Sequence, residues 1–213
     1  MSLNRLLRFI VMFAILVSPA YCSSAQLQSM LTSSLIKRLR KSYDKLEGYS
    51  GELSMLKNGV KEKAFIEFKK GNSRLYFTSG PKKGKSLKAS KGLIYQKVFG
   101  IFVPIVVPSK VFWEANGDMG PGYIIARLTE EADNIKDGIP LKTSIKEGPE
   151  YIIIKSDYVG DGNYRYRHAE VYVDQSLLLP VKAAYDTNGD NKFNEIYEFN
   201  FHAFKFAKAK IYQ

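Results

Sequence analysis

Apolar positions first recur at helical spacing along the chain and then alternate with polar positions. Between Gln26 and Leu46 the apolar side chains lie mostly opposite a set of Lys and Arg residues, which predicts one amphipathic helix stopped by Gly48. Asn58-Gly59 then separates two alternating segments and is the strongest short-range signal for a hairpin turn. We predict three antiparallel strands after the helix, over Tyr49–Lys57, Val60–Lys69 and Arg74–Thr78.

The segment from Leu93 to Trp113 departs from this alternation because it is almost wholly apolar. Pro104 and Pro108 interrupt it, and two prolines so close together exclude a regular central strand or a helix. An apolar stretch without regular hydrogen bonding either fills a core or lines a cavity. The sequence leaves both alternatives open.

A second helix is predicted over Tyr123–Lys136, after the glycine-rich turn at 117–122 and before Gly138 and Pro140. The rest of the chain carries strand and turn signals throughout. The elements together predict an α+β fold, in which two helices cover one face of an antiparallel sheet of about eight to ten strands. The later strands are predicted at Leu141–Lys146, Tyr151–Tyr158, Tyr164–Asp174, Leu179–Asp186 and Phe193–Phe204.

The N-terminal 25 residues have the order of a secretory signal peptide: two arginines, an apolar run over Phe9–Val17, and small residues up to Ala25. The run is much shorter than the roughly 20 residues of a spanning helix. We expect cleavage after Ala25, which leaves residues 26–213 as one periplasmic domain, and cleavage after Cys22 is the alternative. Acylation of Cys22, which would anchor a lipoprotein, is disfavoured by the large Tyr21 before it. Either cleavage removes the only cysteine.

Charge and composition restrict the partners. A chain of 213 residues with 45% hydrophobic residues can bury a core without metals or disulfides. The formal net charge is +11, and residues 57–97 alone carry +10, with twelve Lys and Arg against Glu62 and Glu67. An exported protein rarely meets nucleic acid, and no aromatic RNA-binding platform is recognisable, so we expect no nucleic-acid partner. Anionic head groups or an acidic partner fit the charge, and so does a solvated strand face.

Three clusters suggest catalytic or metal chemistry, and each is incomplete. Ser79–Ser86 ends in Gly-Lys-Ser but lacks the first glycine of a phosphate-binding loop, which indicates a lysine-rich turn. The Asp and Asn residues at 186–190 begin like a calcium loop without its later Gly and Glu, and they also suit a hairpin turn. His168 and Glu170 share a strand face but lack a third ligand. We therefore expect no enzymatic activity, no metal and no cofactor. A hydrolase of envelope polymers stays a weaker alternative, and it requires clustered buried carboxylates.

Residues 48–53, Gly-Tyr-Ser-Gly-Glu-Leu, are followed by the Asn58-Gly59 hairpin and by Ala64–Lys69. These stretches resemble the start of LolA-like proteins, the outer-membrane lipoprotein carriers and their relatives. Other stretches look like an uncharacterised family of exported bacterial proteins related to LolA. These are Gly80–Lys85, Ala169–Asp174, Leu179-Pro180-Val181, Tyr185-Asp186 with Gly189, and Tyr197-Glu198-Phe199.

The resemblance implies a curved antiparallel half-barrel, whose concave apolar face is covered by helices and accepts acyl chains. It implies an exported, monomeric and non-enzymatic carrier or binding protein for lipids or lipoproteins. The alternative is an envelope interaction module with a filled core, whose basic hairpin docks an acidic protein or an anionic membrane surface. For the carrier, we predict a ligand site with an apolar wall or rim and a cationic group for anionic head groups. The apolar residues are Phe99, Ile101, Phe102, Val103, Ile105 and Val107, and the cationic residues are Lys82, Lys83 and Lys85.

Overall fold

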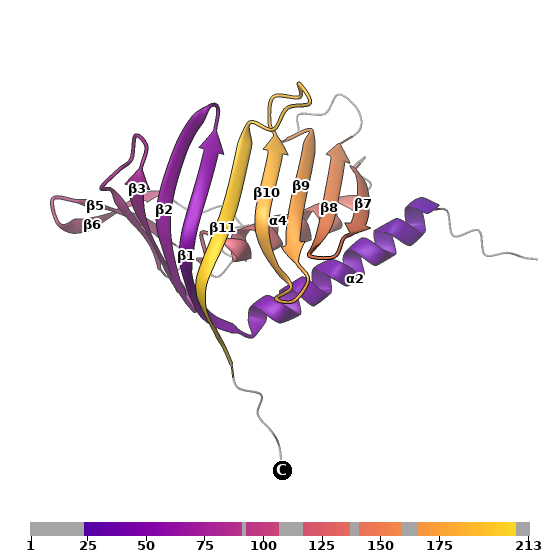
Figure 1. The fold of residues 1–213 in the computed structure, drawn as a ribbon, viewed down its shortest axis with the longest axis horizontal. Helices are drawn as coiled ribbons and strands as arrows, with labels where there is room; N and C mark the ends of the chain where they lie inside the picture. The colour runs from indigo at the N-terminus through magenta and orange to yellow at the C-terminus, as the bar shows by residue number, and fades with distance from the viewer. Residues whose placement is uncertain (1–23, 91–92, 107–116, 137–140, 159–165, 208–213) are drawn as a thin grey trace, which may run out of the picture.

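The computed structural model of the chain describes residues 24–90, 93–106, 117–136, 141–158 and 166–207. Its helices are α2 (Ser24–Asp44) and α4 (Pro121–Lys136). The strands are β1 (Leu46–Lys57), β2 (Val60–Lys69), β3 (Asn72–Ser79), β4 (Ser86–Ser90), β5 (Leu93–Val98), β6 (Ile101–Val106), β7 (Leu141–Glu147), β8 (Tyr151–Tyr158), β9 (His168–Asp174), β10 (Leu179–Asp186) and β11 (Glu195–Phe206). They form one antiparallel sheet in the order β6-β5-β4-β3-β2-β1-β11-β10-β9-β8-β7 (Figure 1).

The predicted α+β fold is confirmed, with a sheet larger than expected. Eleven strands pair in the described residues, because 86–106 forms three strands that the sequence pattern did not predict. The first helix ends at Asp44, and Gly48 lies inside β1, so the prediction that Gly48 stops the helix was wrong. The strand predicted from Tyr164 begins at His168, and the last strand covers Glu195–Phe206.

The N-terminal meander follows the predicted alternation. Asn58 and Gly59 form a two-residue turn with φ of 49° and 80°, and Lys57 pairs with Val60 across it. Both φ values are positive, as a type I′ hairpin turn requires. The apolar face of the meander is buried as predicted, with Ala64, Ile66, Phe68, Leu75 and Phe77 all in the core.

The proline-containing segment is more regular than expected. Residues 93–106 form the β5–β6 hairpin, in which Pro104 pairs with Tyr95. The expectation of an irregular stretch was wrong here because β6 is the edge of the sheet. Proline is tolerated in an edge strand, where no further neighbour needs its missing N–H.

The helices lie on one face of the sheet because of how the two edges are connected. β6 and β7 lie at opposite edges, and α4 lies in the segment that links them. Helix α2 packs beside α4, and both contact β7 and β10 (Figure 1). We call the face beneath the helices the concave face and the opposite side the outer face.

The concave face holds the hydrophobic core. Helix α2 contributes Leu35, Ile36 and Leu39, and α4 contributes Ile125 and Leu128.

Neither helix, over its described residues, combines the length and the apolar character that a membrane span requires.

Candidate functional site

Eight of the nine predicted site residues lie on two neighbouring hairpins of the described structure. Lys82, Lys83 and Lys85 lie in the loop between β3 and β4, and five of the apolar residues lie on the β5–β6 hairpin. This hairpin projects from the edge of the sheet farthest from β7 (Figure 1). The side chain of Ile105 and all of Val107 lie outside the described residues.

The two hairpins present these residues at the same end of the sheet. Leu87 of β4 pairs with Gln96 of β5 in antiparallel register. Lys85 lies two residues before Leu87, and Val98 lies two residues after Gln96, so the two are at the same end of the β4–β5 pair. The loop of residues 80–85, which we call the lysine loop, therefore borders the turn of the β5–β6 hairpin. The sequence alone did not reveal this proximity, because it depends on the strands formed by 86–106.

The β5–β6 turn consists of Phe99 and Gly100, whose φ values are 49° and 85°. Val98 pairs with Ile101 across this turn, so it has the same form as the Asn58-Gly59 turn. Phenylalanine is an unusual residue at such a position, because a bulky side chain strains a left-handed backbone. We call residues 98–103 the hairpin tip.

The hairpin tip exposes large apolar side chains. Phe99 is fully exposed and Ile101 is 70% exposed, while Val98, Phe102 and Val103 each leave more than a third of their surface in water. The alternative that this run fills the core is therefore wrong for the hairpin tip. Its assignment as a cavity wall stays a prediction, which the described residues do not test.

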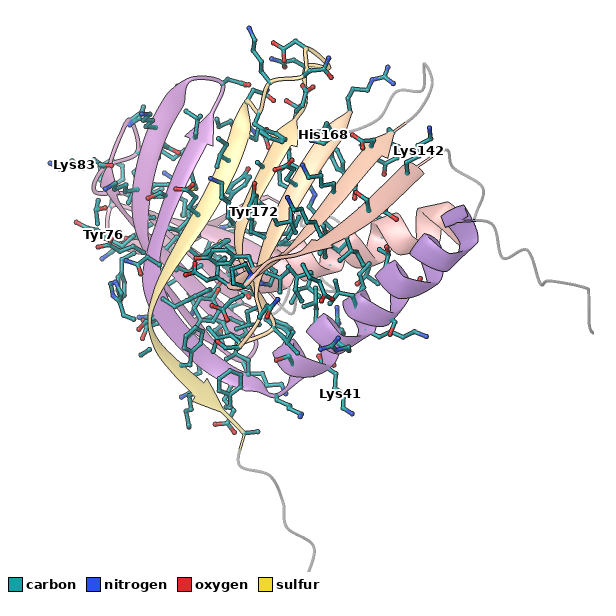
Figure 2. The ribbon with its side chains drawn as sticks, turned by 45° about the vertical axis from the view of Figure 1, so that its right-hand side comes forward. Lys41, Tyr76, Lys83, Lys142, His168 and Tyr172 are labelled. Atoms are coloured by element: carbon teal, nitrogen blue, oxygen red, sulfur yellow. The ribbon has the colours of Figure 1, made fainter. Side chains whose placement is uncertain are left out.

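The lysine loop is a well-ordered turn. The amide N–H of Gly84 donates to the carbonyl of Phe77 at 2.9 Å, and that of Lys83 donates to the carbonyl of Gly80 at 3.0 Å. Lys82 forms an ion pair with Glu62 at 2.8 Å, while Lys83 and Lys85 extend into solvent. Figure 2 shows Lys83 at the outer margin of the molecule, away from the helices. The loop joins strands β3 and β4, whereas a phosphate-binding loop leads into a helix. The loop is therefore a lysine-rich turn, as predicted.

A second site lies on the concave face, where Asp118 fixes the start of α4 to the sheet. Asp118 is fully buried, and its Oδ1 accepts hydrogen bonds from the Tyr49 hydroxyl at 2.5 Å and from the Gly120 N–H at 2.9 Å. Its Oδ2 accepts from the Gly122 N–H at 2.8 Å, and Tyr43 of α2 also donates to this carboxyl. The carboxyl therefore joins α2, β1 and the N-terminus of α4. We call it the Asp118 latch.

Burial determines the proton affinities in the Asp118 latch. It raises the pKa of Asp118, although the hydrogen bonds from Tyr49, Gly122 and Gly120 oppose the shift. Burial and the neighbouring carboxylate of Asp118 raise the pKa of Tyr49 well above its usual value. The sequence analysis missed this site. Its signal was the sequence Asp-Met-Gly-Pro-Gly at 118–122, because Asp favours the start of a helix and proline favours the first helical position.

The predicted His168–Glu170 pair lies on the outer face (Figure 2). His168 contacts Asp157, and Glu170 accepts hydrogen bonds from Lys155 at 2.5 Å and from Tyr172 at 2.7 Å. Burial alone would raise the pKa of Glu170, but these hydrogen bonds hold it below its usual value. The network matches a solvated strand face. Tyr166, two residues before His168, precedes β9 and is buried.

The two fully buried carboxylates of the described residues, Asp118 and Asp186, are each bound by their own hydrogen-bond donors. Asp186 is fully buried and accepts the backbone N–H groups of Asn188, Gly189 and Asn191, so it organises the turn between β10 and β11. Asp118, the other fully buried acid in the described residues, is held by different groups. The described part of the chain also shows no group of three or more His, Cys, Asp or Glu residues that would hold a metal ion.

Two depressions lined by described residues lie on the outer face. One, of about 300 Å³, is bordered by Phe65, Tyr76, Phe102 and Lys97. The other, of about 310 Å³, is bordered by charged side chains including Glu67 and Arg74. Both are open and partly charged, so neither is a closed apolar cavity for acyl chains.

Comparison with solved structures identifies the fold. The chain is 16% identical to MucB with a TM-score of 0.53, and the likeness covers 84% of this chain and 60% of MucB. The chain has a LolA-like fold. An uncharacterised conserved protein from Thermus thermophilus has a TM-score of 0.51 at 10% identity, over 82% of this chain and 86% of that one. The lipoprotein LppX from Mycobacterium tuberculosis has a TM-score of 0.46 at 14% identity, over 81% of this chain and 95% of that one. The sequence matches no protein-family model and no curated protein.

Proposed function

We propose that the protein is an exported, non-enzymatic carrier or binding protein that holds acyl chains of lipids or lipoproteins against its concave face. The observation that carries this proposal is the apolar lining beneath the helices. It extends without interruption from Leu75 and Phe77 of β3 across the sheet to Ile152 and Ile154 of β8. A continuous apolar surface of this kind suits a ligand that is a long hydrocarbon chain.

The helices act in this proposal as a cover that can separate from the sheet. Specific polar contacts hold it at a few points: the Asp118 latch, the Thr32 and Thr143 hydroxyls at 3.2 Å, and the Ser42 hydroxyl donating to the Leu177 carbonyl at 2.9 Å. Much of the remaining contact is apolar and without direction. Acyl chains can therefore replace helix side chains against the sheet.

The energy of this exchange comes from burial of hydrocarbon. Each methylene group removed from water contributes about 0.8 kcal/mol, so a chain of ordinary fatty-acid length gains enough to offset partial loss of helix contacts. Aromatic rings line the centre of the face, where Tyr49 stacks on Phe68 at 5.3 Å and meets the edge of Phe201 at 5.3 Å between ring centroids. Such rings accept an acyl chain without needing a polar partner.

A LolA-like fold and the predicted signal peptide both support a role in the cell envelope. The His168–Glu170 network is committed to neighbouring side chains on the outer face, and Asp118 and Asp186 to backbone and tyrosine donors. This arrangement supports binding over hydrolysis.

Native mass spectrometry tests the proposal on protein purified from a lysate that contains membranes. We expect a bound species heavier than the apo-protein by the mass of one or more lipids, and organic extraction should release it. A lipid-free spectrum, together with no uptake of a fluorescent fatty acid by the purified protein, would contradict the proposal.

A further inference from the structure

We propose that the hairpin tip is a membrane-docking element: Phe99 and Ile101 insert into the interface of an anionic bilayer, while Lys83 and Lys85 contact the phosphate head groups. This inference goes beyond the binding of a ligand on the concave face. It concerns a different surface of the molecule, and its test does not depend on whether the concave face holds acyl chains.

The first observation is the choice of residue at the turn. The protein builds the same two-residue turn twice, with Asn58-Gly59 in one hairpin and Phe99-Gly100 in the other. The φ of the first residue is 49° in both turns. Asparagine tolerates this left-handed conformation, whereas for phenylalanine it is strained. Phe99 thus makes the fold less favourable locally and gains no burial within the protein in return, since it is fully exposed.

The second observation is the shape of the apolar surface. Phe99 occupies the apex of a two-stranded hairpin at the edge of the sheet, with Ile101 just behind it. A protein partner generally requires a broad complementary surface of about 800 Å² on each side. A narrow apolar projection suits a bilayer interface, into which a few side chains insert while the flanking polar groups stay at the head groups.

The third observation is the charge next to the hairpin tip. Lys83 and Lys85 are exposed in the bordering loop, and Lys97 is exposed on β5 immediately before Val98. Residues 57–97 carry a net charge of +10. Basic side chains near an anionic membrane are attracted to its negative surface potential. The apolar side chains at the hairpin tip and the lysines next to it together match the interface of an anionic phospholipid bilayer.

Flotation with lipid vesicles tests the proposal on the processed protein. The vesicles contain phosphatidylcholine with about one third phosphatidylglycerol, and pure phosphatidylcholine vesicles are the comparison. We expect the wild-type protein to float with the anionic vesicles and to dissociate as salt is added.

Phe99→Asn is the decisive variant, because it places at this turn the residue that the protein already uses at position 58. We expect it to fold and to bind anionic vesicles about tenfold more weakly. Val60→Asn is the matched control, since Val60 is 45% exposed beside the other turn, and its binding should equal that of the wild type. Lys83→Gln with Lys85→Gln should weaken binding to anionic vesicles and reduce its salt dependence.

The proposal fails if Phe99→Asn, folded as judged by its circular dichroism spectrum, binds the vesicles as tightly as the wild type. It also fails if the wild-type protein does not bind anionic vesicles at all, in which case an acidic protein becomes the better partner for this surface.

Discussion

The hydroxyl groups of Tyr43 and Tyr49 reach Asp118 because two nearby residues lack side chains. A Cβ atom at Gly120 would overlap the Tyr49 hydroxyl, and one at Gly122 would overlap the Tyr43 hydroxyl. The sequence Asp118-Met-Gly-Pro-Gly thus provides both the buried acceptor and the space for its donors. This arrangement fixes where the helical cover meets the sheet.

Gly120→Ala should lower the free energy of unfolding by about 2 kcal/mol, because the added methyl group forces Tyr49 away from Asp118. Urea denaturation measures this change. Gly148→Ala is the control, since a Cβ there would approach only the Tyr151 carbonyl, at 3.4 Å. In a Tyr49→Phe background the penalty of Gly120→Ala should shrink, and an unchanged penalty would show that the clash lies elsewhere.

Asp118→Asn should change how stability depends on pH. Burial raises the pKa of Asp118 in the folded protein, so folding favours its protonated form. The stability linked to this proton is fully present below the unfolded pKa of about 3.9 and is lost as the pH rises through the folded pKa. The wild type should therefore gain stability relative to Asp118→Asn as the pH is lowered toward the unfolded pKa. Urea titrations of both proteins over a series of decreasing pH values would refute this if the difference between them stayed constant.

Residue roles were predicted well where they follow from local pattern. Asp186 was expected to belong to a turn, and its carboxylate does accept the backbone donors of that turn. Asp118 was not expected, because its partners Tyr43 and Tyr49 come from two distant elements. A contact of that kind depends on how α4 crosses the sheet, which local spacing does not encode.

At the scale of elements, the meander was predictable because one face of each strand is buried. Alternation in β2 and β3 determines which side chains enter the core, and the Asn58-Gly59 turn determines their register. β5 and β6 have no such contrast, since apolar residues occupy both faces and the turn carries Phe99. Their apolar character left core filling and a cavity wall or rim as alternatives, and the exposure of the hairpin tip contradicts the first of these there.

Phe99→Asn should raise the free energy of unfolding by about 1 kcal/mol, because it relieves the strained backbone at φ 49°. The converse change, Asn58→Phe, should lower it by at least as much, since that turn has the same φ and the Asn58 side chain also accepts a hydrogen bond from Asn194. Thermal and urea unfolding of both variants measure the effect. A loss of stability in Phe99→Asn would mean that the phenylalanine side chain supports the fold.

An engineered disulfide between α2 and β7 should hold α2 against the sheet. The Thr32 and Thr143 hydroxyl oxygens lie 3.2 Å apart, and the chain has no cysteine after Cys22. The oxidised Thr32→Cys/Thr143→Cys variant should be more stable by about 3 kcal/mol and should take up a fluorescent fatty acid more slowly than the same protein after reduction. Uptake at the same rate in both states would exclude separation of α2 from β7 as a step in binding.

At the scale of the whole molecule, the strand order explains why the helices cover one face. β1 to β6 run outward to one edge, β7 to β11 return from the other, and β1 pairs with β11 in the middle. Both helices and eight of the eleven described strands were predictable from periodicity. The pairing of β1 with β11 was not, because the two strands are far apart in sequence and their pairing requires the whole sheet to form.

Charge and apolar surface are also arranged on this scale. The described basic residues of 57–97 lie on the half of the sheet that ends in the hairpin tip, whereas the contacts of the helices with the sheet are mainly with β7 and β10 of the other half. One molecule thus presents a proposed membrane-docking edge and, apart from it, a proposed acyl-binding face. This separation would allow a carrier to contact a bilayer while its cover opens.

Photo-crosslinking with a phospholipid that carries a diazirine within its acyl chain tests the central claim most directly. Lipid-loaded protein is irradiated after removal of vesicles, digested and mapped by mass spectrometry. The account predicts crosslinks to concave-face residues such as Ile66, Phe68 and Ile125, which lie beneath or within the cover. Crosslinks confined to outer-face residues such as Phe65 and Tyr76, or no crosslinked lipid at all, would contradict it.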